Sequence, residues 1–249
     1  GRDEATARGS WYATEQLLKR NAVPGLTSLQ GARVAVQGYG NAGSVAACLF
    51  HDAGAVIVAV SDSRGGIANE EGLDPCAVLA HKEETGTVVG FPGALMIGSG
   101  DVLTIDCDIL IPAALECQVT TVNAPDVKAK LVVEAANGPL TAAADETLRY
   151  KGVVVLPDIL ANAGGVVVSY FEWVQNLEYQ KWKLDKVERL LNQKMCDAVD
   201  ETVDRFDELV QRHEQGENKD LPGPTLRDAA LVSAITRIAS VVLQRDIWP

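Results

Sequence analysis

Short, largely apolar runs recur along the chain, and longer segments with helical periodicity lie between them. Apolar runs of about 4–8 residues without alternation are typical of strands buried on both faces of a parallel sheet. The strands predicted in this way are residues 33–37, 55–60, 108–114, 131–134 and 153–156. Helices are predicted between them at residues 8–21, 45–53, 75–85 and 141–150. Because strands and helices alternate, we expect an α/β fold, a doubly wound, mostly parallel sheet with helices on both faces.

The C-terminal third is predicted to be mainly helical. A helix is expected at residues 163–178, with Asn162 placed as its N-cap. Residues 183–213 contain no glycine or proline, and their apolar stripe predicts one amphipathic helix of about 45 Å. Thr225 and Asp228 have the spacing of a capping box at the start of a last helix.

Apolar residues of this last helix, between 226 and 242, cover more than one face, so we expect it to be buried on more than one side. Glycine-rich or weakly periodic stretches are predicted as loops at residues 65–72, 86–108 and 214–224.

A glycine-rich loop joins the first predicted strand to its helix. Gly38, Gly40 and Gly43 form a G-x-G-x-x-G within a strand–helix–strand unit. In such a Rossmann-type unit the glycines permit a tight turn, a close approach of the backbone to a pyrophosphate, and close packing of helix on strand. Asp62 follows Gly43 by nineteen residues, where a carboxylate accepts hydrogen bonds from an adenosine ribose. The pattern predicts a dinucleotide-binding domain over residues 1–249, with residues 183–249 as a C-terminal helical return.

Charge and composition narrow the classes of partner. Lys and Arg number 22 against 34 Asp and Glu, a formal net charge of −12 at pH 7. We therefore expect neither nucleic acid nor an anionic membrane as a partner. No apolar run is long enough for a membrane span, and we expect no signal peptide before the first helix. Five cysteines without C-x-x-C spacing and three histidines without ligand spacing predict no disulfides and no metal site, as in a cytoplasmic protein.

Several stretches resemble the C-terminal half of the glutamate/leucine/phenylalanine/valine dehydrogenase family. They are residues 1–9 (GRDEATARG), 36–41 (VQGYGN), 111–116 (IPAALE), 134–139 (EAANGP) and 157–176 (PDILANAGGVVVSYFEWVQN). The resemblance extends over essentially the whole chain. The last stretch is similar to hexameric glutamate dehydrogenases in particular.

The resemblance implies roles for residues along one crevice. The pyrophosphate would be held by Gly38, Gly40, Asn41, Ala42 and Gly43, and the adenosine ribose by Asp62 and Ser63. The cofactor cleft would be lined by Ala113 and Ala114, and the nicotinamide end would be contacted by Arg2, Thr6, Asn137 and Asn162. The substrate would face Val166 and Ser169, whose hydroxyl would donate to the side-chain carboxylate of glutamate. The alternatives are helix capping for Thr6 and Asn162, and a solvated hydroxyl for Ser169.

The same resemblance implies a larger enzyme. In this family an upstream domain supplies the lysines and the aspartate that polarise the substrate and move protons, and we expect that domain to be absent from this chain. No catalytic residue is therefore assigned here. The complete enzyme, a homohexamer, would catalyse the NAD(P)-dependent reversible oxidative deamination of L-glutamate to 2-oxoglutarate and ammonia.

Alternatives remain open for substrate, coenzyme and class. A branched-chain or aromatic amino-acid dehydrogenase would not need a polar residue at Ser169. A non-catalytic nucleotide-binding regulatory subunit would need the coenzyme crevice alone. Asp62 favours NAD because a carboxylate repels a 2′-phosphate, whereas Arg64, two residues later, would allow some binding of NADP.

Overall fold

A single twisted sheet organises the chain. The computed structural model describes residues 2–217 and 220–245. Within them the sheet has seven strands, in the order β4-β3-β2-β1-β5-β6-β7. Their bounds are β1 Arg33–Gln37, β2 Val56–Ser61, β3 Gly66–Ala68, β4 Leu95–Ile97, β5 Ile109–Pro112, β6 Leu131–Val133 and β7 Val154–Leu156. Strands β2, β1, β5, β6 and β7 run parallel to one another, which confirms the five predicted strands and the mostly parallel sheet.

Strands β3 and β4 correct two of the predicted loops. They pair antiparallel at one edge of the sheet, with Gly66 opposite Ile97 and Ala68 opposite Leu95. Each has three residues, too few for a periodicity to show in the sequence. They are strands because β3 pairs with β2 and β4 pairs with β3. This pairing depends on the tertiary structure.

Helices fill the connections and form the C-terminal third. They are α1 Ala5–Lys19, α2 Asn41–Asp52, α3 Pro75–Thr85, α4 Ala142–Tyr150, α5 Asp158–Ala161, α6 Gly164–Leu177, α7 Leu184–Glu214 and α8 Leu226–Gln244, with 3₁₀ turns η1 Asp101–Leu103 and η2 Ala124–Asp126. None of the described helices is long and apolar enough to cross a membrane. The loop predicted at 214–224 includes residues 218 and 219, which lie outside the described residues.

Side chains cap the starts of three helices, and of the two predicted N-caps one is confirmed and one is wrong. The Asp74 carboxylate accepts from the N–H groups of Cys76 and Ala77, and Thr141 accepts from that of Ala144. Thr225 forms the expected capping box with Asp228 at the start of α8. Helix α6 has Ala163 at its N-cap, so Asn162 is not the cap that the sequence predicted. The short helix α5 intervenes and turns the Asn162 side chain elsewhere.

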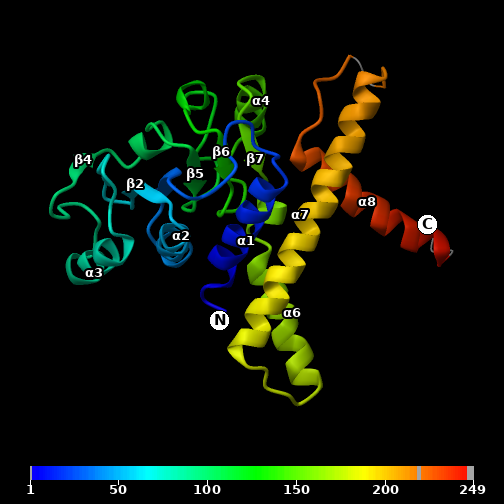
Figure 1. Cartoon of the computed structure of the whole chain (residues 1–249), viewed down its shortest axis with the longest axis horizontal. Helices are drawn as coiled ribbons and strands as arrows, with labels where there is room; N and C mark the ends of the chain where they lie inside the picture. The colour runs from blue at the N-terminus through cyan, green and yellow to red at the C-terminus, as the bar shows by residue number, and fades with distance from the viewer. Residues whose placement is uncertain (1, 218–219, 246–249) are drawn as a thin grey trace.

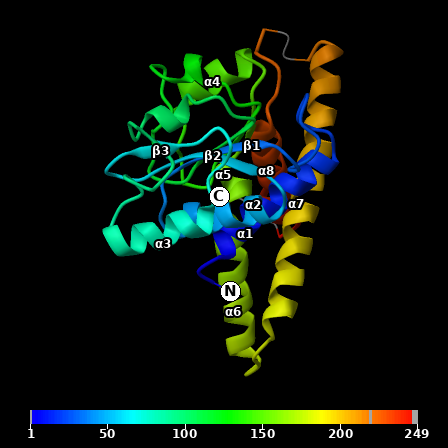
Figure 2. The ribbon, with the colours of Figure 1, turned by 60° about the vertical axis from the view of Figure 1, so that its left-hand side comes forward.

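Both faces of the sheet are covered, as the pattern predicted. Alternate residues of β1 point to opposite sides: Val34 and Val36 join the core formed with α1, α2 and α6, whereas Ala35 joins the core formed with α4, η1 and η2. Helices α6 and α7 run side by side and extend beyond the sheet at one end (Figures 1 and 2). The predicted apolar stripe of α7 is confirmed at Leu191, Met195, Val199 and Val203, which are all buried.

The expectation that α8 is buried on more than one side is wrong for this chain. Its first turns contribute the buried Leu226 and Ala229, whereas Ile235, Ile238 and Leu243 are 64–68% exposed. Figure 1 shows α8 crossing α7 and running away from the sheet. These three exposed positions therefore have no covering element within the described chain, although the pattern of α8 is that of a buried helix.

Helices α1 and α6 cross at two glycines. A Cβ on Gly9 would lie 2.8 Å from the Cα of Gly164, and a Cβ on Gly164 would overlap the carbonyl oxygen of Ala5. The Ser10 hydroxyl donates to the carbonyl of Ala161 at 2.9 Å and closes the same contact. This backbone-to-backbone approach places the start of α6 against the start of α1.

We predict that Gly164→Ala lowers the free energy of unfolding by about 1–3 kcal/mol, because the added methyl must displace backbone atoms. Chemical denaturation measures the change. The matched control is Gly100→Ala, since a Cβ there meets no atom within 4 Å and φ is −82°. Equal stabilities for the two variants would contradict a tight crossing.

Candidate functional site

A groove follows the carboxyl ends of the parallel strands. It consists of two adjoining cavities of about 420 and 490 Å³. Ala113, Ala114 and Leu115, in the loop after β5, line both cavities and join them. Parallel strands bring their carboxyl ends to one edge, so the loops after β1, β2, β5, β6 and β7 meet there. Most of the residues that the resemblance placed along one crevice line this groove.

The glycine loop forms the middle of the groove. Gly38 has φ +89°, and a Cβ there would lie 2.9 Å from the backbone of Ala113 and Ala114. Gly43 packs its Cα against the carbonyl of Gly38, a place where no side chain fits. Gly40 is the N-cap of α2 and supplies no side-chain cap, so the first N–H groups of the helix face the groove without a side-chain acceptor. Such a helix start suits an anionic group.

Two residues that line the first cavity each have a buried polar atom without a partner among the described residues. These atoms are Oε1 of Gln37, a residue 6% exposed, and Oγ of Ser61, a residue 1% exposed. A buried polar atom without a hydrogen bond is costly, and in a residue of a cavity wall it points to a water or a ligand as the missing partner. The site therefore fits the polar adenosine half of a dinucleotide. Neither Gln37 nor Ser61 was among the site residues predicted from the sequence, because each is simply the last residue of a strand.

Asp62 lies in the same cavity with its carboxylate largely engaged. It accepts from the N–H groups of Arg64 and Val88, both at 2.8 Å, and from the hydroxyl of Thr87 at 3.2 Å. Partial burial acts to raise the pKa of Asp62, but these hydrogen bonds together with Lys82 outweigh it and lower the pKa. A carboxylate has about four acceptor positions, so about one remains for a ribose hydroxyl.

Lys82 on α3 is a lining residue that the sequence did not indicate. Its ammonium donates to the carbonyl of Tyr39 at 2.6 Å, and the Tyr39 hydroxyl donates to the carbonyl of Pro75 at 2.8 Å. Helix α3 thus supports the glycine loop from behind and places a cation near Asp62 and Ser63. In the sequence, a helical lysine that lines a cavity looks the same as one that points into solvent, so Lys82 could not be recognised from its position alone.

The second cavity joins α1, the loops after β6 and β7, and α6. Asn162 donates from Nδ2 to Oδ1 of Asn137 at 2.8 Å and, more weakly, to the carbonyl of Ala136 at 3.4 Å. The pair lines the cavity together with Thr6 and Ala42. The structure therefore brings together four predicted residues from four separate segments.

Val166 and Ser169 complete this wall from one face of α6. Val166 is 75% exposed, and the Ser169 hydroxyl donates to the carbonyl of Gly165 at 3.0 Å. A serine hydroxyl has one donor hydrogen, so Ser169 must rotate it to donate to a ligand. Arg2 lies outside the lining and pairs with Glu172 at 3.0 Å on the surface.

Comparison with known proteins identifies the family. The family model for glutamate/leucine/phenylalanine/valine dehydrogenases matches residues 1–245. The chain belongs to this dehydrogenase family. It is 48% identical over its whole length to the NADP-specific glutamate dehydrogenase A1 of Halobacterium salinarum and 45% identical to the glutamate dehydrogenase of Thermotoga maritima. In each case it covers 56% of the relative, so this family member spans little more than half the length of these relatives.

Solved structures agree with the fold of this dehydrogenase-family chain. The hetero-hexameric glutamate dehydrogenase of Thermus thermophilus, in a leucine-bound form, superposes with a TM-score of 0.86 at 34% identity. The enzyme of Peptoniphilus asaccharolyticus superposes with a TM-score of 0.77 at 31% identity. Both comparisons cover the whole of this chain and 55% and 54% of those chains.

We predict that Asp62→Asn reduces the loss of thermal stability that the parent shows as the pH falls. The folded pKa of Asp62 is lowered, so its contribution is full above the unfolded pKa of about 4 and is lost as pH falls through the folded value. Thermal melts from pH 7 to 3 measure this loss in the parent. The control is Asp207→Asn, which removes an exposed carboxylate of α7. Parallel curves for Asp62→Asn and the parent would contradict the assignment.

Proposed function

We propose that this chain is the coenzyme-binding part of a glutamate dehydrogenase, an NAD(P)-dependent enzyme of oxidative deamination. The observation that carries the proposal is the groove: a helix start without a side-chain cap and two unpartnered polar atoms, Gln37 Oε1 and Ser61 Oγ. Family membership and the high identity to glutamate dehydrogenases support the substrate class.

The residues that line the groove indicate which steps of the proposed reaction this chain, the coenzyme and an upstream domain would each support. A bound nicotinamide coenzyme would accept hydride from the amino-acid Cα, while the protein contributes position and electrostatics. Among the described residues, the cavity that contains Asn137 and Ser169 is lined by no lysine and no aspartate, and its one carboxylate, Glu116, belongs to an exposed residue. We therefore place the proton-transferring groups in an upstream domain, whose closure over the groove would exclude water.

The assembly that we propose for the complete enzyme is a homohexamer in the cytoplasm. Exposed apolar side chains support contacts with further subunits. Tyr170, Trp173 and Leu177 on α6 are 56–60% exposed, and α8 also has exposed apolar side chains. Exposed apolar groups of this size favour burial against another chain or domain. The net charge of −12 supports the proposal that nucleic acid and membranes are not partners.

For the coenzyme, we propose a preference for NAD with tolerance of NADP. The Asp62 carboxylate would repel a 2′-phosphate, and its remaining acceptor position suits a ribose hydroxyl. Lys82 and Arg64 act in the opposite direction, because both place positive charge beside the Asp62 loop. The margin between the two coenzymes is therefore expected to be small.

For the substrate, the α6 face supports glutamate. Val166 and Ser169 are three residues apart and line the same cavity, so one can pack on the methylene groups while the other donates to the side-chain carboxylate. Burying a carboxylate without donors costs several kcal/mol. A leucine, valine or phenylalanine pocket would gain nothing from a hydroxyl there. This contrast is the basis for placing the branched-chain and aromatic alternatives second.

We predict that the purified chain binds NAD, binds NADP less tightly, and does not turn over glutamate. Calorimetric titration measures both affinities. The matched variant is Gly40→Asp, because a Cβ at Gly40 meets no atom within 4 Å and an acidic N-cap suits the helix. Its carboxylate should nevertheless weaken binding roughly tenfold or more, since juxtaposed like charges cost several kcal/mol.

Three outcomes would contradict parts of this proposal. Binding unaffected by Gly40→Asp would place the dinucleotide elsewhere. Tighter binding of NADP than of NAD would show that Lys82 and Arg64 outweigh Asp62. Steady-state oxidation of glutamate by the chain alone would show that no upstream domain is required.

We predict that Ser169→Ala in the complete enzyme lowers kcat/KM for glutamate about tenfold, the size expected for one hydrogen bond to a charged group. Norvaline, which replaces the side-chain carboxylate by a methyl group, should be little affected. Equal losses on glutamate and norvaline would show that Ser169 supports the helix through its bond to Gly165 and does not contact the carboxylate.

A further inference from the structure

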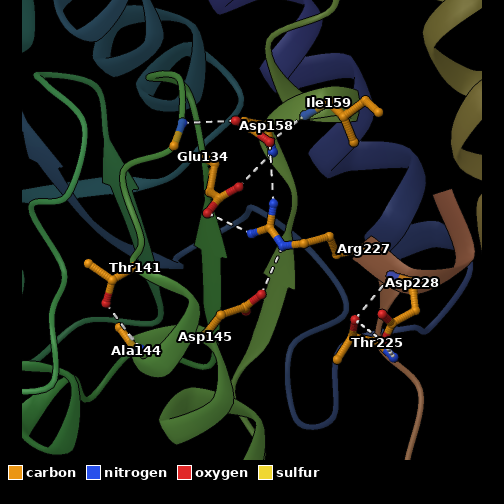
Figure 3. A network of polar contacts seen from close by, with 10 residues as sticks. Glu134, Thr141, Ala144, Asp145, Asp158, Ile159, Thr225, Arg227 and Asp228 are labelled. Carbon is orange, nitrogen blue, oxygen red and sulfur yellow. Dashed lines mark hydrogen bonds and ion pairs between the residues drawn. The ribbon is translucent and has the colours of Figure 1, made fainter. Parts of the chain in front are cut away.

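Arg227 stands at the centre of a charged cluster (Figure 3). Its Nε donates to Asp145 and its Nη2 to Glu134, both at 2.8 Å, and its Nη1 donates to Asp158 at 3.3 Å. The three carboxylates come from α4, from the end of β6 and from the start of α5. One guanidinium thus joins the C-terminal helix α8 to three elements of the sheet domain.

The position of Arg227 needs an explanation because it is locally unfavourable. It is the second residue of α8, where the positive end of the helix dipole disfavours a cation. Burial raises the pKa of Glu134 against the opposing effect of Arg227, and the Glu134 side chain is only 1% exposed. A buried carboxylate needs a hydrogen-bonded cation to offset its loss of hydration. The planar guanidinium of an arginine can donate to several carboxylates at once.

The cluster ties down the bases of two loops that line the groove. Glu134 accepts from the N–H of Asp158 at 2.7 Å, which links the end of β6 to the start of α5. Asp158 accepts from the N–H of Gly138 at 2.8 Å, which links α5 back to the loop after β6. Asn137 precedes Gly138, and Asn162 directly follows α5. The spacing of the two asparagines is therefore set by bonds within the Arg227 cluster.

We propose that Arg227 is a positioning residue for the nicotinamide end of the groove. Its guanidinium holds the loops after β6 and β7 at the spacing that keeps Asn137 and Asn162 in one hydrogen-bonded pair. This inference rests on the proposed function, because it assigns that pair to the nicotinamide half of the coenzyme. Arg227 itself lines neither cavity of the groove, so it acts through the two asparagines.

The test compares NAD with ADP-ribose, which has the same phosphates and adenosine but no nicotinamide. Arg227→Gln should weaken NAD binding by about fivefold to tenfold, the size of one or more lost hydrogen bonds, with ADP-ribose changed less than about twofold. Calorimetry on the whole chain measures both ligands. The control is Arg237→Gln on the same helix, which removes an exposed pair with Glu201 and should leave both affinities unchanged.

Asn137→Ala supplies the second half of the test. If Arg227 acts through the asparagine pair, both substitutions remove the same interaction. The variant that carries both Arg227→Gln and Asn137→Ala should then bind NAD as tightly as whichever single variant binds it less tightly. Additive losses would overturn the inference, as would equal weakening of NAD and ADP-ribose by Arg227→Gln. A parent chain that binds neither ligand would defeat the proposed function, and the inference with it.

Should Arg227→Gln fail to fold, Asp158→Asn provides the same comparison with a smaller disturbance. It keeps the side-chain volume but removes one of the two carboxylate oxygens that join Arg227 to the N–H of Gly138. Selective loss of NAD over ADP-ribose is again expected. Equal affinity of the parent and of Asp158→Asn for both ligands would overturn the inference.

Discussion

Burial of the parallel sheet on both faces is the constraint from which the groove follows. Parallel strands need crossovers, and the crossover helices cover the two faces formed by alternate residues such as Val34 and Ala35. Since all five parallel strands then end at one edge, their following loops have to converge there. Glycines complete the convergence: Gly38 and Gly43 let the first loop close, and Gly9 and Gly164 let α6 approach α1.

Electrostatics in the groove depend more on oriented backbone groups than on cations. The chain carries a net charge of −12, and among the described groove residues Lys82 is the only basic side chain. An anionic ligand can still be held, because the start of α2 presents N–H groups and a positive dipole end. Arg227 lines neither cavity of the groove, and its guanidinium is paired with three carboxylates.

Periodicity predicted the elements that are long or doubly buried, and it missed those that depend on partners. The five parallel strands and α7 were predictable because their apolar patterns extend over whole elements. Strands β3 and β4 were not, since three residues have no period. The α8 pattern was read as burial on several sides, but its side chains are exposed, because a sequence pattern records an apolar surface without saying which chain covers it. Asn162 was misread as the N-cap of α6 because the four-residue helix α5, which ends just before Asn162, is too short to show a period in the sequence.

By itself, the sequence determined the fold class, the glycine loop and the strand-end loops, because these depend on local patterns and on fixed spacings. Only the tertiary structure decided how the polar groups are used. The Asp62 carboxylate is shared with Arg64, Thr87 and Val88, and Gln37 and Ser61 are left with unpartnered atoms. Glu134 and Arg227 lie 93 positions apart, yet they form one ion pair. Hydrogen bonds between such distant residues depend on packing, and no local pattern in the sequence encodes them.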